Sequence, residues 1–413
     1  MRRRLLLASS LGVFGSDWPQ FRGPGRMGLS AEKGLLKEWP KAGPKLLWQQ
    51  QAIGDGYGTV AVAGRFLYAV SNNGMDDEFA QALAVADGSA VWAARIGGVG
   101  NPNQQPPYPM ARSTPSLDGD KVYVFSSDGD LACLRAATGE VVWRKNVRAD
   151  FSGVPGTWGY AESPLVDGDV LVVTPGGAAA TMAALNKTTG AAIWKSAVPG
   201  GDKAAYSSVI VAQAAGRRQY VQFLDKGVVG VDAKTGQFLW RYTGTAGGPA
   251  NIASPITKGN YVYSSNARRF NGGLVQLTAV AGGVAAEQVY LGRDMPNTLG
   301  GQVLVGDVLY GTNQQGPVAA DFATGKIHWQ EAAFGPGAVL HAEDRLYFHA
   351  ENGEVALVEA TVEGYRERGR FTPPNPPKRR DSRERAWTYP AVANGRLYIR
   401  DLGCLWCFDV KAT

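Results

Sequence analysis

Two stretches, GVDAKTGQFLW at 230–240 and AADFATGKIHW at 319–329, set the pattern of this chain. Each one runs through apolar residues into a Thr-Gly turn and ends on a tryptophan four residues after the glycine. Glycine readily adopts the positive φ that tight turns require, and apolar and polar residues alternate on both sides of the turn. Each stretch therefore predicts two short antiparallel strands joined by a turn, with the tryptophan on the second strand.

The turn recurs along most of the chain. Similar turns end at Trp92, Trp143, Trp194, Trp240 and Trp329, and degenerate copies end at Tyr290 and Phe371. A second landmark is a turn followed by a strand whose fifth residue is aromatic or apolar. It occurs at 64–68, 119–123, 168–172, 216–220, 259–263, 306–310, 343–347 and 394–398. A four-stranded unit repeating every 40–50 residues or so is typical of a propeller blade.

The last copy of the second landmark lies at the C-terminus, where LWCFDV (405–410) has no fourth strand of its own. The stretch GPKLLW, ending at Trp48, has no blade before it. Pairing the two would remove an exposed sheet edge. The sequence thus predicts an all-β, eight-bladed propeller of four-stranded antiparallel blades, with the last blade closed by residues 44–49 and the C-terminal strands. We expect a signal-like segment at 1–15, an N-terminal extension at 16–43 and one propeller domain at 44–413.

The N-terminus, MRRRLLLASSLGVFG (1–15), has a basic start followed by leucines and small side chains, as in a secretory signal peptide. The alternative is a ragged translation start on a soluble protein, and whether the segment is cleaved stays open. Export would place the protein in the periplasm or outside the cell. No apolar run is long enough for a membrane-spanning helix.

The net charge of +6 has two main sources, residues 2–4 and the Pro-rich segment 365–387. Domains that bind nucleic acid spread basic residues over a whole face. We therefore expect no nucleic-acid partner and interpret the Pro-rich segment as a solvated, mobile loop, whose role the sequence leaves open.

The two stretches quoted first resemble the tryptophan-docking repeat of the PQQ-type quinoprotein propellers, and matches extend from about residue 44 to 413. The stretch DWPQFRGPGRMGLS (17–30) is similar to the opening of secreted bacterial PQQ-repeat proteins. This family includes PQQ-dependent alcohol dehydrogenases and the non-enzymatic outer-membrane assembly factor BamB. The resemblance implies the propeller fold. It does not imply the cofactor, because the repeated tryptophans are packing elements between blades.

Cysteine and histidine residues give no sign of a metal or redox centre. Cys407 falls in the same repeat position as Cys133, where other copies have alanine or glycine, and Cys404 lies three residues away on the opposite face of the strand. We therefore expect no disulfide between Cys404 and Cys407. The histidines, at 328, 341 and 349, are predicted to have surface or packing roles.

The long connections between blades are the most informative places for function. They span 97–111, 147–161, 243–252, 291–301 and 372–388, and together with the turns between second and third strands they should form one loop-rich face. Polar and aromatic residues stand where these connections meet the inner strands. The predicted ligand-binding residues at this funnel mouth are Tyr57, Arg112, Trp158, Tyr160, Glu162, Tyr206, Asn251 and Asn297. The alternative is that they only line a hydrated channel.

Two functions follow from these observations. The first, which we favour, is a secreted, non-enzymatic, monomeric binding or scaffold propeller that uses the loop-rich face for a protein, peptide or glycan. The second is a PQQ- and calcium-dependent dehydrogenase of an alcohol or sugar. Such enzymes hold the quinone over Ca²⁺ with Glu, Asn and Asp, and a disulfide between adjacent cysteines caps the ring. Glu162 and Asn251 have suitable side chains. However, no motif transfers the family's ligands onto them and the adjacent cysteine pair is missing, so we expect neither cofactor nor metal.

Overall fold

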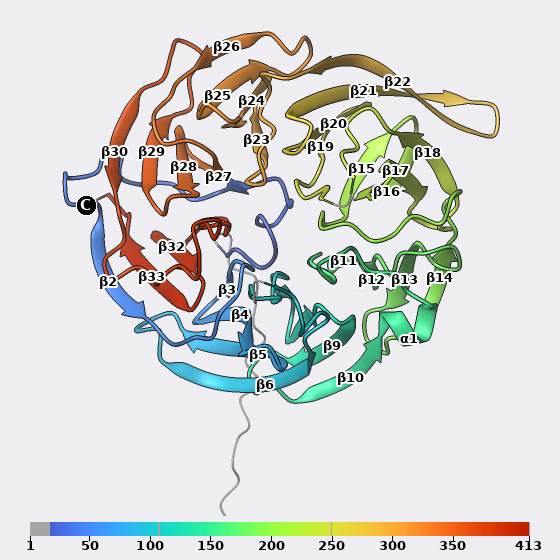
Figure 1. Ribbon diagram of the computed structural model, residues 1–413, viewed down its shortest axis with the longest axis horizontal. Helices are drawn as coiled ribbons and strands as arrows, with labels where there is room; N and C mark the ends of the chain where they lie inside the picture. Colours follow the sequence, from blue (N-terminus) through green and yellow to red (C-terminus); the bar gives the residue numbers. More distant parts are fainter. Residues whose placement is uncertain (1–16, 106–107, 249, 413) are drawn as a thin grey trace, which may run out of the picture.

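Eight sheets surround a common axis in the computed structural model, which describes residues 17–105, 108–248 and 250–412 (Figure 1). Each sheet is a blade of four antiparallel strands, and the seventh blade gains a short parallel fifth strand. The described residues contain one helix, α1 (Val147–Phe151). The predicted all-β, eight-bladed propeller is therefore confirmed. The signal-like segment 1–15 lies outside the described residues.

The strands follow the repeat in sequence order. Blades one to four comprise β3 (Ala61–Ala63), β4 (Phe66–Asn73), β5 (Asp77–Ala84), β6 (Ala90–Gly98), β7 (Ser116–Asp118), β8 (Lys121–Phe125), β9 (Asp130–Arg135), β10 (Val141–Asn146), β11 (Leu165–Asp167), β12 (Val170–Val173), β13 (Met182–Asn186), β14 (Ala192–Ser196), β15 (Ile210–Ala214), β16 (Arg217–Leu224), β17 (Gly227–Asp232) and β18 (Phe238–Tyr242). Blades five to eight comprise β19 (Ile256–Lys258), β20 (Tyr261–Asn266), β21 (Asn271–Val280), β22 (Gly283–Gly292), β23 (Gln302–Val305), β24 (Val308–Thr312), β25 (Pro317–Asp321), β26 (Ile327–Gln330), β27 (Gly337–Ala342), β28 (Arg345–Ala350), β29 (Val355–Glu359), β30 (Glu367–Phe371), β31 (Ala391–Ala393), β32 (Arg396–Asp401) and β33 (Cys404–Asp409), with β1 (Leu29–Ser30) in blade seven and β2 (Lys45–Gln50) in blade eight.

Blade eight joins the two ends of the chain. Strand β2 pairs antiparallel with β33, and Trp48 lies opposite Cys407. The indole Nε1 of Trp48 donates a hydrogen bond to the Val85 carbonyl of blade one, at 3.0 Å. The predicted closure by residues 44–49 is confirmed, and it leaves the ring without a gap between its first and last blades.

The small residues of the repeat separate large rings. Cys133 lies opposite Trp143 on one neighbouring strand and Tyr123 on the other. Cys407 occupies the corresponding place in blade eight, and Cys404 lies at the start of the same strand. All three cysteines are buried and free, which confirms that Cys404 and Cys407 are not bonded to each other. The repeat position of Cys133 and Cys407 requires a small side chain because two aromatic rings flank it.

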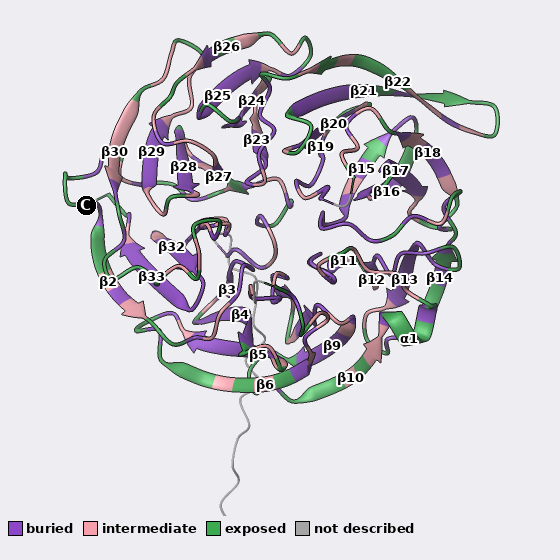
Figure 2. Cartoon of the chain, viewed as in Figure 1, coloured by how far each residue is buried: buried purple, intermediate pink, exposed green. Residues whose placement is uncertain are grey.

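Burial follows the blade geometry. Middle strands such as β8, β9 and β13 are mostly buried, and outermost strands such as β6, β10 and β14 are mostly exposed or partly exposed (Figure 2). Consecutive blades pack through their outer aromatics as well. Trp92 Nε1 donates to the Ala136 carbonyl of the next blade at 2.9 Å, and its ring lies against Gly139.

The N-terminal extension contacts blade one and then blade seven before it reaches blade eight. Trp18 pairs with Val62 on the inner strand of blade one, and β1 pairs in parallel with β27 of blade seven. Between these points the chain passes the centre of the ring, seen as the dark blue segment in Figure 1. Glu32 then accepts hydrogen bonds from the backbone N–H groups of Asn394 and Gly395. The extension is thus an integral part of the propeller core.

Candidate functional site

A central cavity of about 640 Å³ opens among the interblade loops. Its lining includes residues that precede the inner strands, for example Tyr57 before β3, Arg112 before β7 and Tyr206 before β15. Phe21 of the N-terminal extension also lines it. Loops from around the ring and a segment from the N-terminal extension therefore build one site on the propeller axis. The volume is within the range of small-ligand pockets.

Half of the predicted site residues line this cavity. Tyr57, Arg112, Trp158 and Tyr206 are brought together there, as the position of the interblade loops predicts. Tyr160, Glu162, Asn251 and Asn297 are not among the lining residues. Tyr160 donates its hydroxyl to the Pro175 carbonyl, and Asn297 donates its amide to the Arg293 carbonyl.

Glu162 and Asn251 serve buried networks within and between blades. Glu162 accepts hydrogen bonds from the Thr174 backbone N–H and from Gln222 Nε2. Burial raises the pKa of Glu162 to about 7, and the hydrogen bonds and nearby Arg26 oppose that shift. Asn251 donates to the Leu224 carbonyl at 2.6 Å and accepts from the Gly247 N–H. Their oxygen atoms are thus already engaged by the protein.

Arginine and aromatic side chains form a cluster on one wall of the cavity. Arg112 Nη1 donates to the Trp158 carbonyl at 2.6 Å, and the Trp158 N–H donates to the Tyr206 hydroxyl at 2.9 Å. The Trp158 and Tyr206 rings lie 5.6 Å apart. The guanidinium of Arg268 lies over the Trp158 ring at 6.0 Å. This Arg112 cluster places two cations beside flat apolar surfaces.

The charge of Arg112 is not paired with a carboxylate within the described residues. Among them, Arg112 makes no ion pair, although Glu78 lies near enough to act on its charge. Glu78 accepts instead from the backbone N–H and the hydroxyl of Ser127. Burial lowers the pKa of Arg112, and the nearby Tyr206, Tyr57 and Glu78 oppose that shift. A half-buried, unpaired guanidinium on a cavity wall favours an anionic ligand group.

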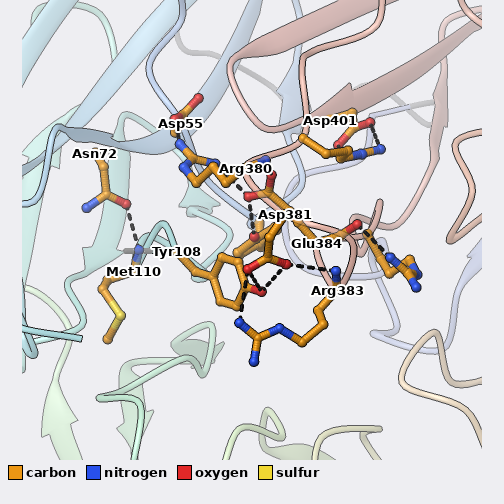
Figure 3. Close-up of polar contacts among 12 residues, drawn as sticks. Asp55, Asn72, Tyr108, Met110, Arg380, Asp381, Arg383, Glu384 and Asp401 are labelled. Atoms are coloured by element: carbon orange, nitrogen blue, oxygen red, sulfur yellow. Dashed lines mark hydrogen bonds and ion pairs between the residues drawn. The ribbon is translucent and has the colours of Figure 1, made fainter. Parts of the chain in front are cut away.

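The Pro-rich segment 365–387, interpreted from the sequence as a solvated, mobile loop, contains strand β30 and most of the loop 372–388, whose arginines form ion pairs. Arg379 forms a two-pronged ion pair with Asp401 at 2.6 and 2.7 Å. Arg380 pairs with both Asp55 of blade one and Glu384 of its own loop (Figure 3). The loop therefore uses part of its basic charge to attach itself to blades one and eight. The sequence pattern missed this because the acidic partners Asp55 and Asp401 lie outside the segment.

This loop also supplies a wall of the cavity. The Trp387 ring lies 5.0 Å from that of Tyr57 and 6.3 Å from that of Tyr108. Tyr108 in turn donates its hydroxyl to Asp381 at 2.8 Å, as Figure 3 shows. Trp387 precedes an inner strand, just as Arg112 does, so the same positional argument would have found it. Phe21 carries no such signal, because nothing in its local sequence places it on the propeller axis.

The described residues contain no group of three or more His, Cys, Asp or Glu side chains suited to hold a metal ion. Among the described lining residues of the cavity, Glu351 is the only carboxylate. Burial raises the pKa of Glu351, and nearby Arg385 opposes that shift. No helix in the part of the chain described here has the length and apolar character to cross a membrane.

Several solved structures of other proteins have a similar fold. BamB from Moraxella catarrhalis is similar with a TM-score of 0.60 at 16% identity, covering 86% of this chain and 95% of that chain. The computationally designed protein Ika8 is similar with a TM-score of 0.60 at 12% identity, covering 89% of this chain and 100% of that chain. The quinohemoprotein alcohol dehydrogenase from Comamonas testosteroni is similar with a TM-score of 0.51 at 13% identity, covering 96% of this chain and 81% of that chain. At such identities these likenesses show the fold alone.

The sequence comparison is more specific than the structural one. No curated protein matches this sequence. A family model described as the outer membrane protein assembly factor BamB matches residues 76–331, which is more than half of the chain. The protein therefore belongs to the BamB-like family of PQQ-type repeat propellers.

Proposed function

We propose that this protein is a non-enzymatic binding module that holds a partner in the central cavity of its loop-rich face. The observation that carries the proposal is the cavity itself, which combines aromatic walls with the unpaired Arg112. Aromatic and arginine side chains supply much of the affinity at protein interfaces. The BamB description of the family model agrees with a protein-binding role.

The alternative, a dehydrogenase with PQQ and calcium, receives less support from the side chains. Calcium prefers several carboxylate and carbonyl oxygens around one point. Glu162 and Asn251 have the right chemistry, but both lie outside the cavity lining and bond to backbone and side-chain groups of neighbouring segments. Glu351 alone does not make a calcium site. The residues present thus do not fit PQQ with calcium.

The signal-like segment 1–15 supports export, so we propose a periplasmic or secreted protein. Fractionation of cells that express the chain with and without residues 1–15 tests this. Export should require the segment, and equal amounts outside the cytoplasm for both forms would contradict the proposal.

A displayed library of random linear peptides, selected on the full chain, tests the binding function. We expect selected peptides to lose binding to Ala267→Trp, because residue 267 lines the cavity and a large ring there narrows it. Ala281→Trp is the matched control, since Ala281 is exposed at the tip of the β21–β22 hairpin, which projects from blade five (Figure 1). Peptides that bind both variants equally, or no selected peptide at all, would contradict a peptide-binding cavity.

Catalysis is tested separately. The chain is incubated with PQQ and Ca²⁺, and dye reduction is followed with a panel of alcohols and sugars. We expect no substrate-dependent reduction. Substrate-dependent reduction by the loaded protein would instead favour the dehydrogenase.

A further inference from the structure

We propose that the partner segment is acidic, with a carboxylate that pairs with Arg112 and an apolar side chain that packs against Trp158 and Phe270. This inference rests on the proposed binding function and names the chemistry of its ligand. The probe class is a linear peptide segment of another protein that carries Asp, Glu or a free C-terminus beside an apolar residue.

The first support is the state of Arg112. One of its terminal nitrogens is engaged by the Trp158 carbonyl, and the guanidinium makes no ion pair with any residue of the described chain. The same contact fixes the orientation of the planar group on the cavity wall. A carboxylate accepts two parallel N–H bonds from a guanidinium, a geometry that a neutral hydroxyl or amide does not reproduce. Arg112 is therefore positioned to recognise a carboxylate.

A second cation reinforces this preference. Arg268 lines the same cavity, is exposed, and lies over the Trp158 ring without an ion pair to any described residue. The opposing charge in the lining is Glu351, whose pKa is raised by burial and which lies near Arg385. Of the charged groups in the described lining, two are cations and one is a carboxylate. The balance favours an anion over a cation.

The mouth of the cavity points to a protein segment. Phe270 lines the cavity and is 45% exposed, so it lies where the cavity opens to solvent, and its φ of 52° is unfavourable for a residue with a side chain. Asn266 fixes this turn by accepting hydrogen bonds from the N–H groups of Arg268 and Arg269. The turn thus presents an arginine and an apolar ring at the rim. A segment that reaches past the rim into the cavity would cover both, which a ligand confined to the cavity would not.

The test uses the peptides selected on the full chain and a synthetic pair made from the best sequence. One peptide keeps its acidic residues and free C-terminus, and the other has Asn or Gln in their place and an amidated C-terminus. We expect the acidic peptide to bind roughly ten- to hundred-fold more tightly, the range for a charge-assisted hydrogen bond. Arg112→Gln should remove most of that difference. Arg217→Gln is the matched control, because Arg217 is exposed, pairs with Asp232, and lies at the end of blade four that faces away from the cavity.

The outcomes distinguish an error in the ligand class from a failure of the proposed binding function. If Arg112→Gln fails to fold, Arg268→Gln replaces it, since that exposed side chain makes no hydrogen bond or ion pair with a described residue and should reduce the acidic preference in part. Peptides that bind in the cavity without acidic preference would overturn the ligand class and leave the binding function standing. Tight binding of a free aromatic acid, with no binding of peptides, would overturn the protein segment as the source. The absence of any binder blocked by Ala267→Trp would instead be a failure of the proposed function.

Discussion

Gly236 turns the chain between β17 and β18 with a φ of 72°, and the Trp194 ring of the preceding blade lies against it. An added Cβ would come within 2.5 Å of that ring. The indole Nε1 of Trp194 also donates a hydrogen bond to the Ala233 carbonyl, which holds the ring in place. Glycine is therefore required here for the backbone angle and for the contact between blades.

Gly236→Ala should destabilise the protein more than Gly216→Ala does. Gly216 has the same φ of 72° but has open space around it. The change at 216 should cost about 1–2 kcal/mol of unfolding free energy, from the left-handed backbone alone. The change at 236 should cost roughly 1–3 kcal/mol more, from overpacking against the ring. Urea unfolding of both variants measures this, and equal losses would show that the ring contact is unimportant.

All three cysteines are buried. Burial raises the pKa of Cys404 to about 11 and that of Cys407 to about 12. Because the thiolate is the reactive form, the native thiols should react slowly with a thiol reagent at neutral pH. Unfolding under non-reducing conditions should release three titratable thiols at once. A smaller number would mean that a disulfide forms in solution.

At the scale of elements, the loop 372–388 is held by charges supplied from two blades. The Asp401 carboxylate is 4% exposed and is paired by Arg379, whereas Arg383 is largely exposed in its pair with Asp381. The loop carries Trp387 into the cavity wall, so its attachment shapes the binding site. This coupling between surface charge and site geometry has a direct test.

Arg379→Gln should lower the unfolding free energy by about 1–3 kcal/mol, because it leaves the buried Asp401 without its partner. Arg383→Gln is the control and should change it by less than about 0.5 kcal/mol, as for most exposed pairs. Urea unfolding gives both values, and limited proteolysis should find the loop cut sooner in Arg379→Gln. Similar behaviour of the two variants would contradict the anchoring role of Asp401.

At the scale of the whole molecule, stability depends on joining the first and last blades. Trp48 is 8% exposed on β2 and bonds across to blade one, whereas Leu46 on the same strand is 38% exposed. Trp48→Ala should cost about 3–5 kcal/mol, the range for deleting a buried large aromatic side chain. Leu46→Ala should cost less than about 1 kcal/mol, because little of its surface is released. An unchanged melting temperature for Trp48→Ala would show that joining the first and last blades contributes little to stability.

The architecture can be predicted from the sequence because the repeat is local. Each turn glycine and the aromatic residue after it lie a few residues apart, so the pattern predicts the outer hairpin of a blade without any long-range information. The unpartnered Trp48 then predicted the closure, since an open sheet edge is unfavourable. The loop-rich face followed from the same reasoning, as did Arg112 and Trp158 on its cavity wall.

The side chains that enter the cavity could not be predicted in the same way, because they depend on long-range packing. Ala161 lines it, whereas its neighbours Tyr160 and Glu162 do not, because those two side chains form hydrogen bonds with the backbone of Pro175 and Thr174. Phe21 reaches the cavity from a segment that no repeat describes, and the acidic partners of loop 372–388 come from residues far away in sequence. A local pattern fixes hydrogen-bonded strands, but the content of a central cavity depends on which distant segments meet on the propeller axis.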